Sequence, residues 1–291
     1  MMPKASQKRD SEADTALRNW RQGDVCLDAG LEFIHVADLS QPGSPAASHA
    51  AGLLQEQGDQ LPIEPVPIIE EVTGFVVLSQ TCDIVRSYVQ RPYVEVSPLI
   101  SVSDECLEDV RCLRRPAFGY IPATAGRLLV ADLDRVMTIE KTVVATWHRV
   151  PGWITDDQAR AFSEVLSRKR MRFAFPDDFV AITGKLQERL RRRHNRQHPE
   201  GAHLRALREI RVRAAPAWDS DQVSLGFWFI KDQEPDGITV AWQELVEQWV
   251  ALLDQSGRFQ IEFAIPCRLE DLTARDYLES DRLDLDSLSS P

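Results

Sequence analysis

The sequence of 291 residues lacks the long apolar runs of a membrane protein. No stretch reaches 18 uninterrupted apolar residues, and residues 1–24 lack the apolar core of a signal peptide. We therefore expect a cytoplasmic protein with no membrane partner. Apolar residues make up 43% of the chain and charged residues 27%, which excludes a chain that is disordered along most of its length.

Cysteine is scarce and irregularly spaced. The five cysteines are an odd number spread along the chain, which excludes a disulfide framework. The closest pair, Cys106 and Cys112, has no CxxC or paired histidine beside it, which argues against a structural zinc site. The sequence also has no GxGxxG, Walker, HExxH or GxSxG motif. We expect reduced thiols, no metal and no cofactor.

Charge is unevenly distributed. The net charge is −11, yet residues 168–213 carry 14 Lys and Arg against 5 Asp and Glu, so this block is +9 and the remainder −20. A phosphate backbone or an acidic protein surface would each fit such a block, as would the chain's own acidic end or plain solvation. The candidate binding residues in its densest run are Arg189, Arg191, Arg192, Arg193 and Arg196.

Short strand patterns separated by turn residues dominate residues 21–150, and they predict a small SH3-like β-barrel. The overall class is therefore α+β. The expected parts are a flexible segment over residues 1–20, the β-barrel over 21–150 with a loop insertion over 41–67, a basic helical segment over 151–215, a small α+β domain over 216–270 and an acidic tail over 271–291.

Helical patterns follow the barrel. Thr155 and Gln158 form a capping-box pattern that opens a helix to about residue 171, and two further helices are predicted over 177–193 and 203–213. Beyond them, a strand over 222–230, a helix capped by Thr239 and a strand over 258–265 predict a β-α-β unit. The apolar stripe of that helix is Trp242, Leu245, Val246, Trp249 and Leu253. A short helix over 272–279 precedes the end of the tail.

A polar turn follows the continuously apolar strand Phe75 to Leu78. It carries the candidate site residues Ser79, Gln80, Cys82 and Asp83. Cys82 is a candidate nucleophile with Asp83, Ser79 and Gln80 as hydrogen-bonding groups, and His148 is its candidate base. Two alternatives stay open: these side chains cap the strand end and a following helix, or they form a binding rim without chemistry.

Three segments carry a resemblance to a known family: Gly23-Asp24-Val25, the strand from Phe75 to Ser79, and the segment from Arg91 to Pro98. Together they resemble the PemK/MazF class of toxins, small SH3-like barrels that cleave RNA. In that class a Gly-Asp-hydrophobic start is followed by Arg-Pro and by a strand that ends in Ser. In this sequence the Arg-Pro pair precedes a different strand from the one ending at Ser79. The resemblance implies Arg91 and Ser97 as candidates for RNA chemistry.

With no cofactor motif, the sequence favours a bacterial-type binding or regulatory protein of the kind found in phage-defence or toxin–antitoxin systems. Its basic helical segment would contact a protein or nucleic-acid partner. The alternative is an enzyme, either a barrel-type endoribonuclease or a cysteine-dependent hydrolase centred on Cys82. A third possibility is a subunit of a larger complex, which exposure of Trp218, Trp228, Trp242 and Trp249 would support.

Overall fold

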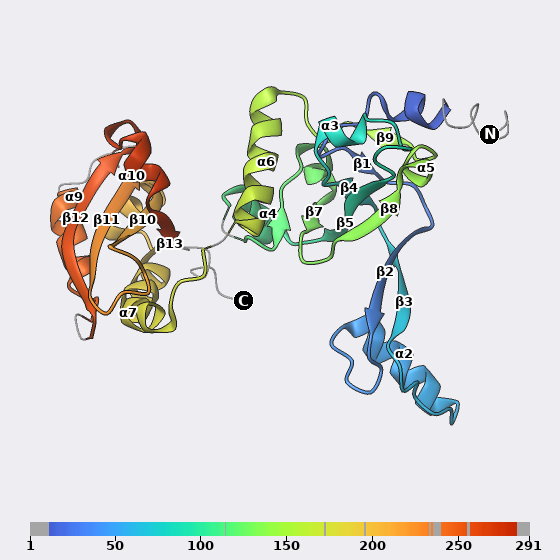
Figure 1. Ribbon diagram of the computed structural model, residues 1–291, viewed down its shortest axis with the longest axis horizontal. Coiled ribbons are helices and arrows are strands. Elements are labelled where there is room, and N and C mark those ends of the chain that lie inside the picture. The colour runs from blue at the N-terminus through green and yellow to red at the C-terminus, as the bar shows by residue number, and fades with distance from the viewer. Residues whose placement is uncertain are drawn as a thin grey trace. The chain divides into compact units, whose positions relative to one another are not determined.

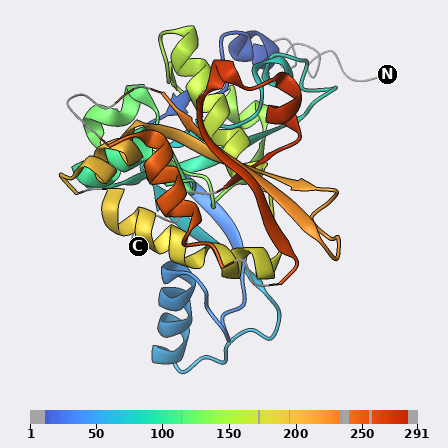
Figure 2. The same ribbon diagram turned by 90° about the vertical axis from the view of Figure 1, so that its left-hand side faces the viewer.

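The computed structural model describes residues 12–113, 115–171, 173–194, 196–232, 234, 240–254 and 257–283. The chain divides into two compact units, Met1–Arg170 and Met171–Pro291, whose elements are drawn from two sides in Figure 1 and Figure 2. The boundary falls inside the stretch 151–215 that the sequence suggests as one basic segment. Its first helix accordingly belongs to unit 1 and the others to unit 2.

Unit 1 is built on an antiparallel sheet in the order β6-β7-β5-β4-β1-β9, with β8 also paired to β5. Its strands are β1 (Val25–Cys26), β4 (Phe75–Val77), β5 (Tyr93–Ser101), β6 (Phe118–Gly119), β7 (Leu129–Asp132), β8 (Met137–Glu140) and β9 (Arg149–Val150). The two end strands, β6 and β9, are two residues long and each pairs with a single described neighbour. The described sheet does not close into a barrel, so the predicted SH3-like β-barrel is not confirmed.

Both faces of the β4 region are buried, which confirms the prediction from its continuous apolar run. Phe75 and Val77 belong to one core cluster, together with Leu17 and Trp20 from the N-terminal part. Val76 belongs to a second cluster, on the other face, with Phe162 of α6 (Asp156–Arg170). The predicted capping box of α6 is confirmed, because Thr155 and Gln158 exchange backbone-to-side-chain hydrogen bonds, each of 3.3 Å.

Short helices connect these strands. They are α3 (Thr81–Ile84), α4 (Asp104–Arg111), the 3-10 helix η1 (Pro122–Arg127) and α5 (Lys141–Val144). α3 follows β4 directly, and α5 follows β8, so each short helix starts where a strand of the main sheet ends.

Residues 31–72 form a separate feature of unit 1, which we call the arm (Figure 1). Strands β2 (Leu31–Ala37) and β3 (Val66–Val72) pair antiparallel, and α2 (Pro45–Glu56) lies between them in sequence. The loop expected over 41–67 is thus wrong for residues 45–56. The helix forms because its alanines pack a small apolar core: Ala47 and Ala51 are buried with Leu39 and Ile68.

Unit 2 has a four-stranded sheet in the order β12-β11-β10-β13. Its elements are α7 (Asp177–His194), α8 (Pro199–Ala206), β10 (Leu207–Ala215), β11 (Val223–Lys231), α9 (Trp242–Val250), β12 (Phe259–Arg268), the 3-10 helix η2 (Leu269–Asp271), α10 (Ala274–Leu278) and β13 (Asp281–Leu283). β11 and β12 are parallel neighbours connected through α9, which confirms the β-α-β prediction. The mixed α+β class is also confirmed.

The helix expected over 203–213 is wrong beyond residue 206. α8 ends at Ala206, and β10 begins at Leu207. The reason is a period of two: Ile210 and Val212 are buried in the main core, whereas Arg211 between them is only partly buried. This strand supplies the centre of the unit 2 sheet.

The predicted apolar stripe is buried, with Trp242, Leu245, Val246 and Trp249 in α9 and Leu253 beyond its end. Trp228, Trp242 and Trp249 are buried and Trp218 is half-buried, so these rings belong to the interior of unit 2 and give no exposed aromatic surface. Thr239, the expected cap of the helix, lies outside the described residues, and the N-cap position is Ala241. Part of the expected tail over 271–291 is folded as α10 and β13.

Candidate functional site

The polar turn after β4 is tied to the backbone of unit 1. Ser79 Oγ accepts a 2.8 Å hydrogen bond from the N–H of Glu95. Thr81 Oγ1 accepts one of 3.2 Å from the N–H of Gln22. These two hydroxyls therefore satisfy backbone donors of neighbouring segments and not the start of α3, whose N-cap makes no side-chain hydrogen bond.

The remaining side chains of the turn point to other partners. Gln80 is the N-cap residue of α3, and its side chain makes no capping hydrogen bond. The exposed Cys82 donates a weak 3.6 Å hydrogen bond to Gln80 Oε1, and Asp83 Oδ1 lies 3.4 Å from Arg86. An amide oxygen cannot take a proton from a thiol at neutral pH, so Gln80 is no base for Cys82.

His148 lies at the opposite end of β1 from Cys82. The turn of Cys82 reaches the segment before β1 through the bond between Thr81 and Gln22. The exposed His148 follows the other end, where its N–H donates a 2.9 Å hydrogen bond to Asp28 Oδ2. The structure therefore does not bring the proposed nucleophile and base together.

Asp28, which accepts the hydrogen bond from the N–H of His148, also contacts Cys26. Cys26 Sγ donates a 3.1 Å hydrogen bond to Asp28 Oδ2. Burial is the main reason that the pKa of Cys26 is raised to about 12, so this thiol stays protonated at neutral pH. It is not a second nucleophile.

Arg91 and Ser97 also lie in different environments, one exposed and the other buried. Ser97 is completely buried in β5, where its hydroxyl donates a 2.6 Å hydrogen bond to the carbonyl oxygen of Asp132. Arg91 is exposed in the turn before β5. A buried hydroxyl with a backbone acceptor cannot meet RNA at the surface, so the described geometry does not pair these two residues.

A buried cation that no sequence motif marks holds the turn in place. Lys141, fully buried at the start of α5, donates hydrogen bonds of 2.6 and 2.7 Å to the carbonyl oxygens of Asp83 and Arg86. Burial lowers the pKa of its ammonium group. Lys141 thus satisfies the carbonyls at the end of α3, where helices need such partners.

The basic run of unit 2 lies at the end of α7, and one buried carboxylate organises part of it. Glu200 accepts two hydrogen bonds from the guanidinium of Arg189, of 2.9 and 3.2 Å, and one of 2.9 Å from Trp249 Nε1. Arg193 lies 3.7 Å from the same carboxylate. Burial opposes ionisation of Glu200, but these hydrogen bonds and charges outweigh it and lower its pKa.

The other arginines of the run are at the surface. Arg191, Arg192 and Arg196 are exposed, and Arg192 pairs with Glu188 at 2.6 Å. Arg196 and Arg205 donate to carbonyl oxygens at the end of α7, those of Arg192 and His194. Residues 188–205 contain six arginines and two glutamates, a local excess of four positive charges.

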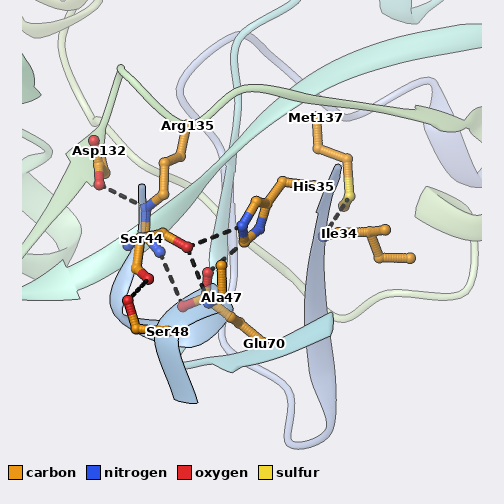
Figure 3. Close-up of polar contacts among 9 residues, drawn as sticks. All are labelled: Ile34, His35, Ser44, Ala47, Ser48, Glu70, Asp132, Arg135 and Met137. Atoms are coloured by element: carbon orange, nitrogen blue, oxygen red, sulfur yellow. Dashed lines mark hydrogen bonds and ion pairs between the residues drawn. The ribbon is translucent and has the colours of Figure 1, made fainter. Parts of the chain in front are cut away.

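A polar cluster in the arm was missed entirely from the sequence (Figure 3). His35 Nε2 lies 3.2 Å from Ser44 Oγ, and His35 Nδ1 lies 3.5 Å from Glu70 Oε1. Arg135 Nη1 lies 3.5 Å from the second oxygen of Glu70, and Arg135 Nε donates to Asp132 at 2.7 Å. The only sequence signal was the Ser44-Pro45 pair, a frequent start of a helix.

Comparison with family models, curated proteins and solved structures finds no match. Among the described residues, no group of three His, Cys, Asp or Glu side chains is placed to hold a metal ion. None of the described helices combines the length and apolar character needed to cross a bilayer.

Proposed function

We propose that the protein is a binding or regulatory protein that holds the phosphate backbone of a nucleic acid on the end of α7. The observation that carries this proposal is the set of exposed arginines Arg191, Arg192 and Arg196, beside two arginines that the buried Glu200 immobilises. Guanidinium groups bind phosphate oxygens in a bidentate manner, which ammonium groups cannot do.

The helix end itself would repel an anion unless it were covered, because a helix C-terminus carries partial negative charge. Arg196 and Arg205 donate to its last carbonyl oxygens and so offset this charge. The side chains of Arg191 and Arg192 are exposed, and an external anion would compete with Glu188 for Arg192. The net charge of −11 does not oppose such contact, because fields beyond about 10 Å are screened at ordinary salt concentration.

A surface of this kind suits a cytoplasmic module in a phage-defence or toxin–antitoxin system, where nucleic acid is a frequent partner. An acidic protein is the competing partner for the same arginines. The nucleic acid is the better fit because the contact residues are arginines spaced along an exposed helical end, and phosphates offer repeated bidentate acceptors along a strand.

The test is fluorescence anisotropy with labelled RNA and DNA oligonucleotides at about 50 and 200 mM salt. Binding that weakens as salt rises is the expected result. The variant Arg191→Glu/Arg192→Glu/Arg196→Glu should bind more weakly and lower the slope of log K against log salt by about 2 to 3.

The matched control reverses three arginines outside this region, Arg111→Glu/Arg160→Glu/Arg275→Glu, whose side chains are 59%, 66% and 81% exposed. It changes the net charge by the same amount and should leave most of the affinity. Absence of binding at low salt would overturn the proposal and favour an acidic protein partner. Equal losses of affinity in the two variants would overturn the assignment to α7.

A further inference from the structure

In the arm, an imidazole lies between a hydroxyl and a carboxylate. Ser44 Oγ accepts a 3.1 Å hydrogen bond from the N–H of Ala47, and His35 Nε2 lies 3.2 Å from the same oxygen. On the other side of the ring, the buried Nδ1 faces Glu70 Oε1 at 3.5 Å and makes no hydrogen bond in the described structure. We propose that Ser44, His35 and Glu70 are the nucleophile, general base and orienting carboxylate of a serine esterase site.

The fold of the arm fixes these positions. In the register of β2 and β3, Phe33 is opposite Glu70 and His35 is opposite Ile68, so His35 and Glu70 lie on the same face of the ribbon. α2 covers this face through Ala47 and Ala51, which pack with Ile68. The N-cap of the helix, Ser44, is thereby brought to His35 (Figure 3).

A second layer orients the carboxylate and the ring. Arg135 binds Glu70 Oε2, which leaves Oε1 directed to His35. The guanidinium also lies over the ring of Phe33 at 5.5 Å, and His35 stacks on that ring with a centroid separation of 5.7 Å. Arg135 is in turn held by Asp132, so the orienting groups come from the main sheet of unit 1 as well as from the arm.

The proton positions follow from the hydrogen-bond inventory. His35 Nδ1 faces an oxygen of the Glu70 carboxylate, which can only accept, so in the neutral ring the proton is placed on Nδ1. Nε2 is then an acceptor, and the hydroxyl of Ser44, whose oxygen accepts from Ala47, donates its own proton to Nε2. This is the tautomer that a general base needs. Catalytic hydrogen bonds are commonly longer in the free enzyme than in the substrate complex, which accommodates the 3.5 Å separation between Nδ1 and Oε1.

The reaction balances without a cofactor. Ser44 Oγ attacks the carbonyl carbon of a carboxylic ester as its proton passes to His35 Nε2. The bond between the carbonyl carbon and the alcohol oxygen then breaks, and the alcohol leaves with that proton. Water, deprotonated by His35, attacks the acyl-Ser44 in the same way and releases the carboxylic acid.

The start of α2 stabilises the oxyanion that forms at each step. The first-turn N–H of Ala46 has no acceptor within the helix, and the positive end of the helix dipole lies at Ser44. The residues on either side of Ser44, Gly43 and Pro45, are small or rigid, and Ser44 is partly exposed, so an ester carbonyl can approach. Esters of small acyl groups are therefore the expected substrate class.

The test uses the full chain and a fluorophosphonate, which phosphonylates an activated serine and releases fluoride, followed by peptide mass spectrometry. Ser44 is expected to be labelled. Ser48 is the matched control, since this exposed serine lies one turn along α2 and donates to the carbonyl oxygen of Ser44. The folded protein should also hydrolyse p-nitrophenyl acetate, and Ser48→Ala should keep both activities.

Variants separate catalysis from helix capping. Ser44→Asp keeps a capping carboxylate at the N-cap and should melt like the wild type while losing labelling and hydrolysis. His35→Gln should slow labelling of Ser44 by at least about 100-fold, and Glu70→Gln should slow it by a smaller factor.

Two results would overturn the assignment. These are no labelling of Ser44 above that of the urea-unfolded chain, or labelling that His35→Gln leaves unchanged. The arginine variants of α7 provide an independent check, because they should retain full labelling whether or not the chain binds nucleic acid.

Discussion

Lys141 and Asp83 are joined by a 2.6 Å hydrogen bond from a buried ammonium to a backbone carbonyl oxygen. The contact links residues 58 positions apart in sequence. It explains how a four-residue helix, α3, ends in a fixed position beyond the end of β4. The same ammonium also satisfies the carbonyl of Arg86, so its removal leaves two acceptors without their partner.

Replacing Lys141 with methionine should destabilise unit 1. The variant keeps most of the side-chain volume but leaves the two carbonyl oxygens unsatisfied, which should lower the free energy of unfolding by about 2 to 4 kcal/mol in urea. Lys185→Met is the control, because Lys185 is exposed on α7 and its loss should cost less than about 0.5 kcal/mol. Equal urea midpoints for the two variants would contradict the role assigned to Lys141.

The pairing of Glu200 predicts a pH dependence of unit 2. Its lowered pKa means that the folded state favours the carboxylate, so the stabilisation is present above about pH 4.3, the usual Glu value, and is lost as pH falls through the lowered pKa. Glu200→Gln should cost about 3 kcal/mol at neutral pH and approach the wild type in acid.

Hydrogen exchange of peptides from unit 2 measures this difference without interference from unit 1. The pKa values of Asp178 and Glu234 in the same unit are also lowered, so the quantity of interest is the gap between wild type and Glu200→Gln at each pH. The control Glu244→Gln changes an exposed residue of α9, and its own difference from the wild type should stay near zero at each pH. A gap for Glu200→Gln that stays constant down to about pH 3 would refute the linkage.

The thiols should differ sharply in alkylation. Burial raises the pKa of Cys26 to about 12 and that of Cys267 to about 11, so neither is a thiolate at neutral pH. Cys82 is exposed. Iodoacetamide followed by peptide mass spectrometry should modify Cys82 in the folded protein and Cys26 and Cys267 only after unfolding. Rapid modification of Cys26 under native conditions would contradict its described burial.

Gly152 is a position where a side chain cannot fit. A Cβ atom there would lie 1.8 Å from the carbonyl oxygen of Gly23, and the N–H of Gly152 donates a 3.2 Å hydrogen bond to the buried Asp24. Gly152→Ala should therefore lower the unfolding free energy of unit 1 by more than about 2 kcal/mol.

Gly184→Ala tests the opposite case. Gly184 lies within α7, and a Cβ added there would meet nothing within 4 Å. The change should raise helix stability by about 0.5 to 1 kcal/mol. Thermal unfolding that ranked the two alanine variants equally would be inconsistent with the described packing.

Several elements were predictable because their side-chain pattern alone fixes them. The stripe from Trp242 to Leu253 has a helical period, and Thr155 with Gln158 marks a helix start by a reciprocal hydrogen bond between near neighbours. α2 was missed because its alanines, serines and glycine resemble a loop in composition, although its buried alanines suit a thin layer against β3. Whether the main sheet is open or closed depends on which strands pair over long sequence separations. No local sequence pattern carries that information.

The candidate sites show the same division. The arginine run at the end of α7 is visible as composition, but its partition between Glu200 and the surface depends on α8 and α9 folding beside it. His35 and Glu70 are 35 positions apart, and they share a face only because β2 and β3 adopt one register. Cys82 and His148 looked compatible as residue types, yet β1 lies between their positions.

The pairing of β13 with β10 bears on how the protein is made. β10 is at residues 207–215, and its partner on one side, β13, is not synthesised until residues 281–283. The ribosome must therefore translate the chain to that point before the unit 2 sheet can be completed. By then the unit 1 sheet, whose last strand ends at Val150, has left the exit tunnel and has had several seconds in which to fold, at about 5 to 20 residues synthesised per second.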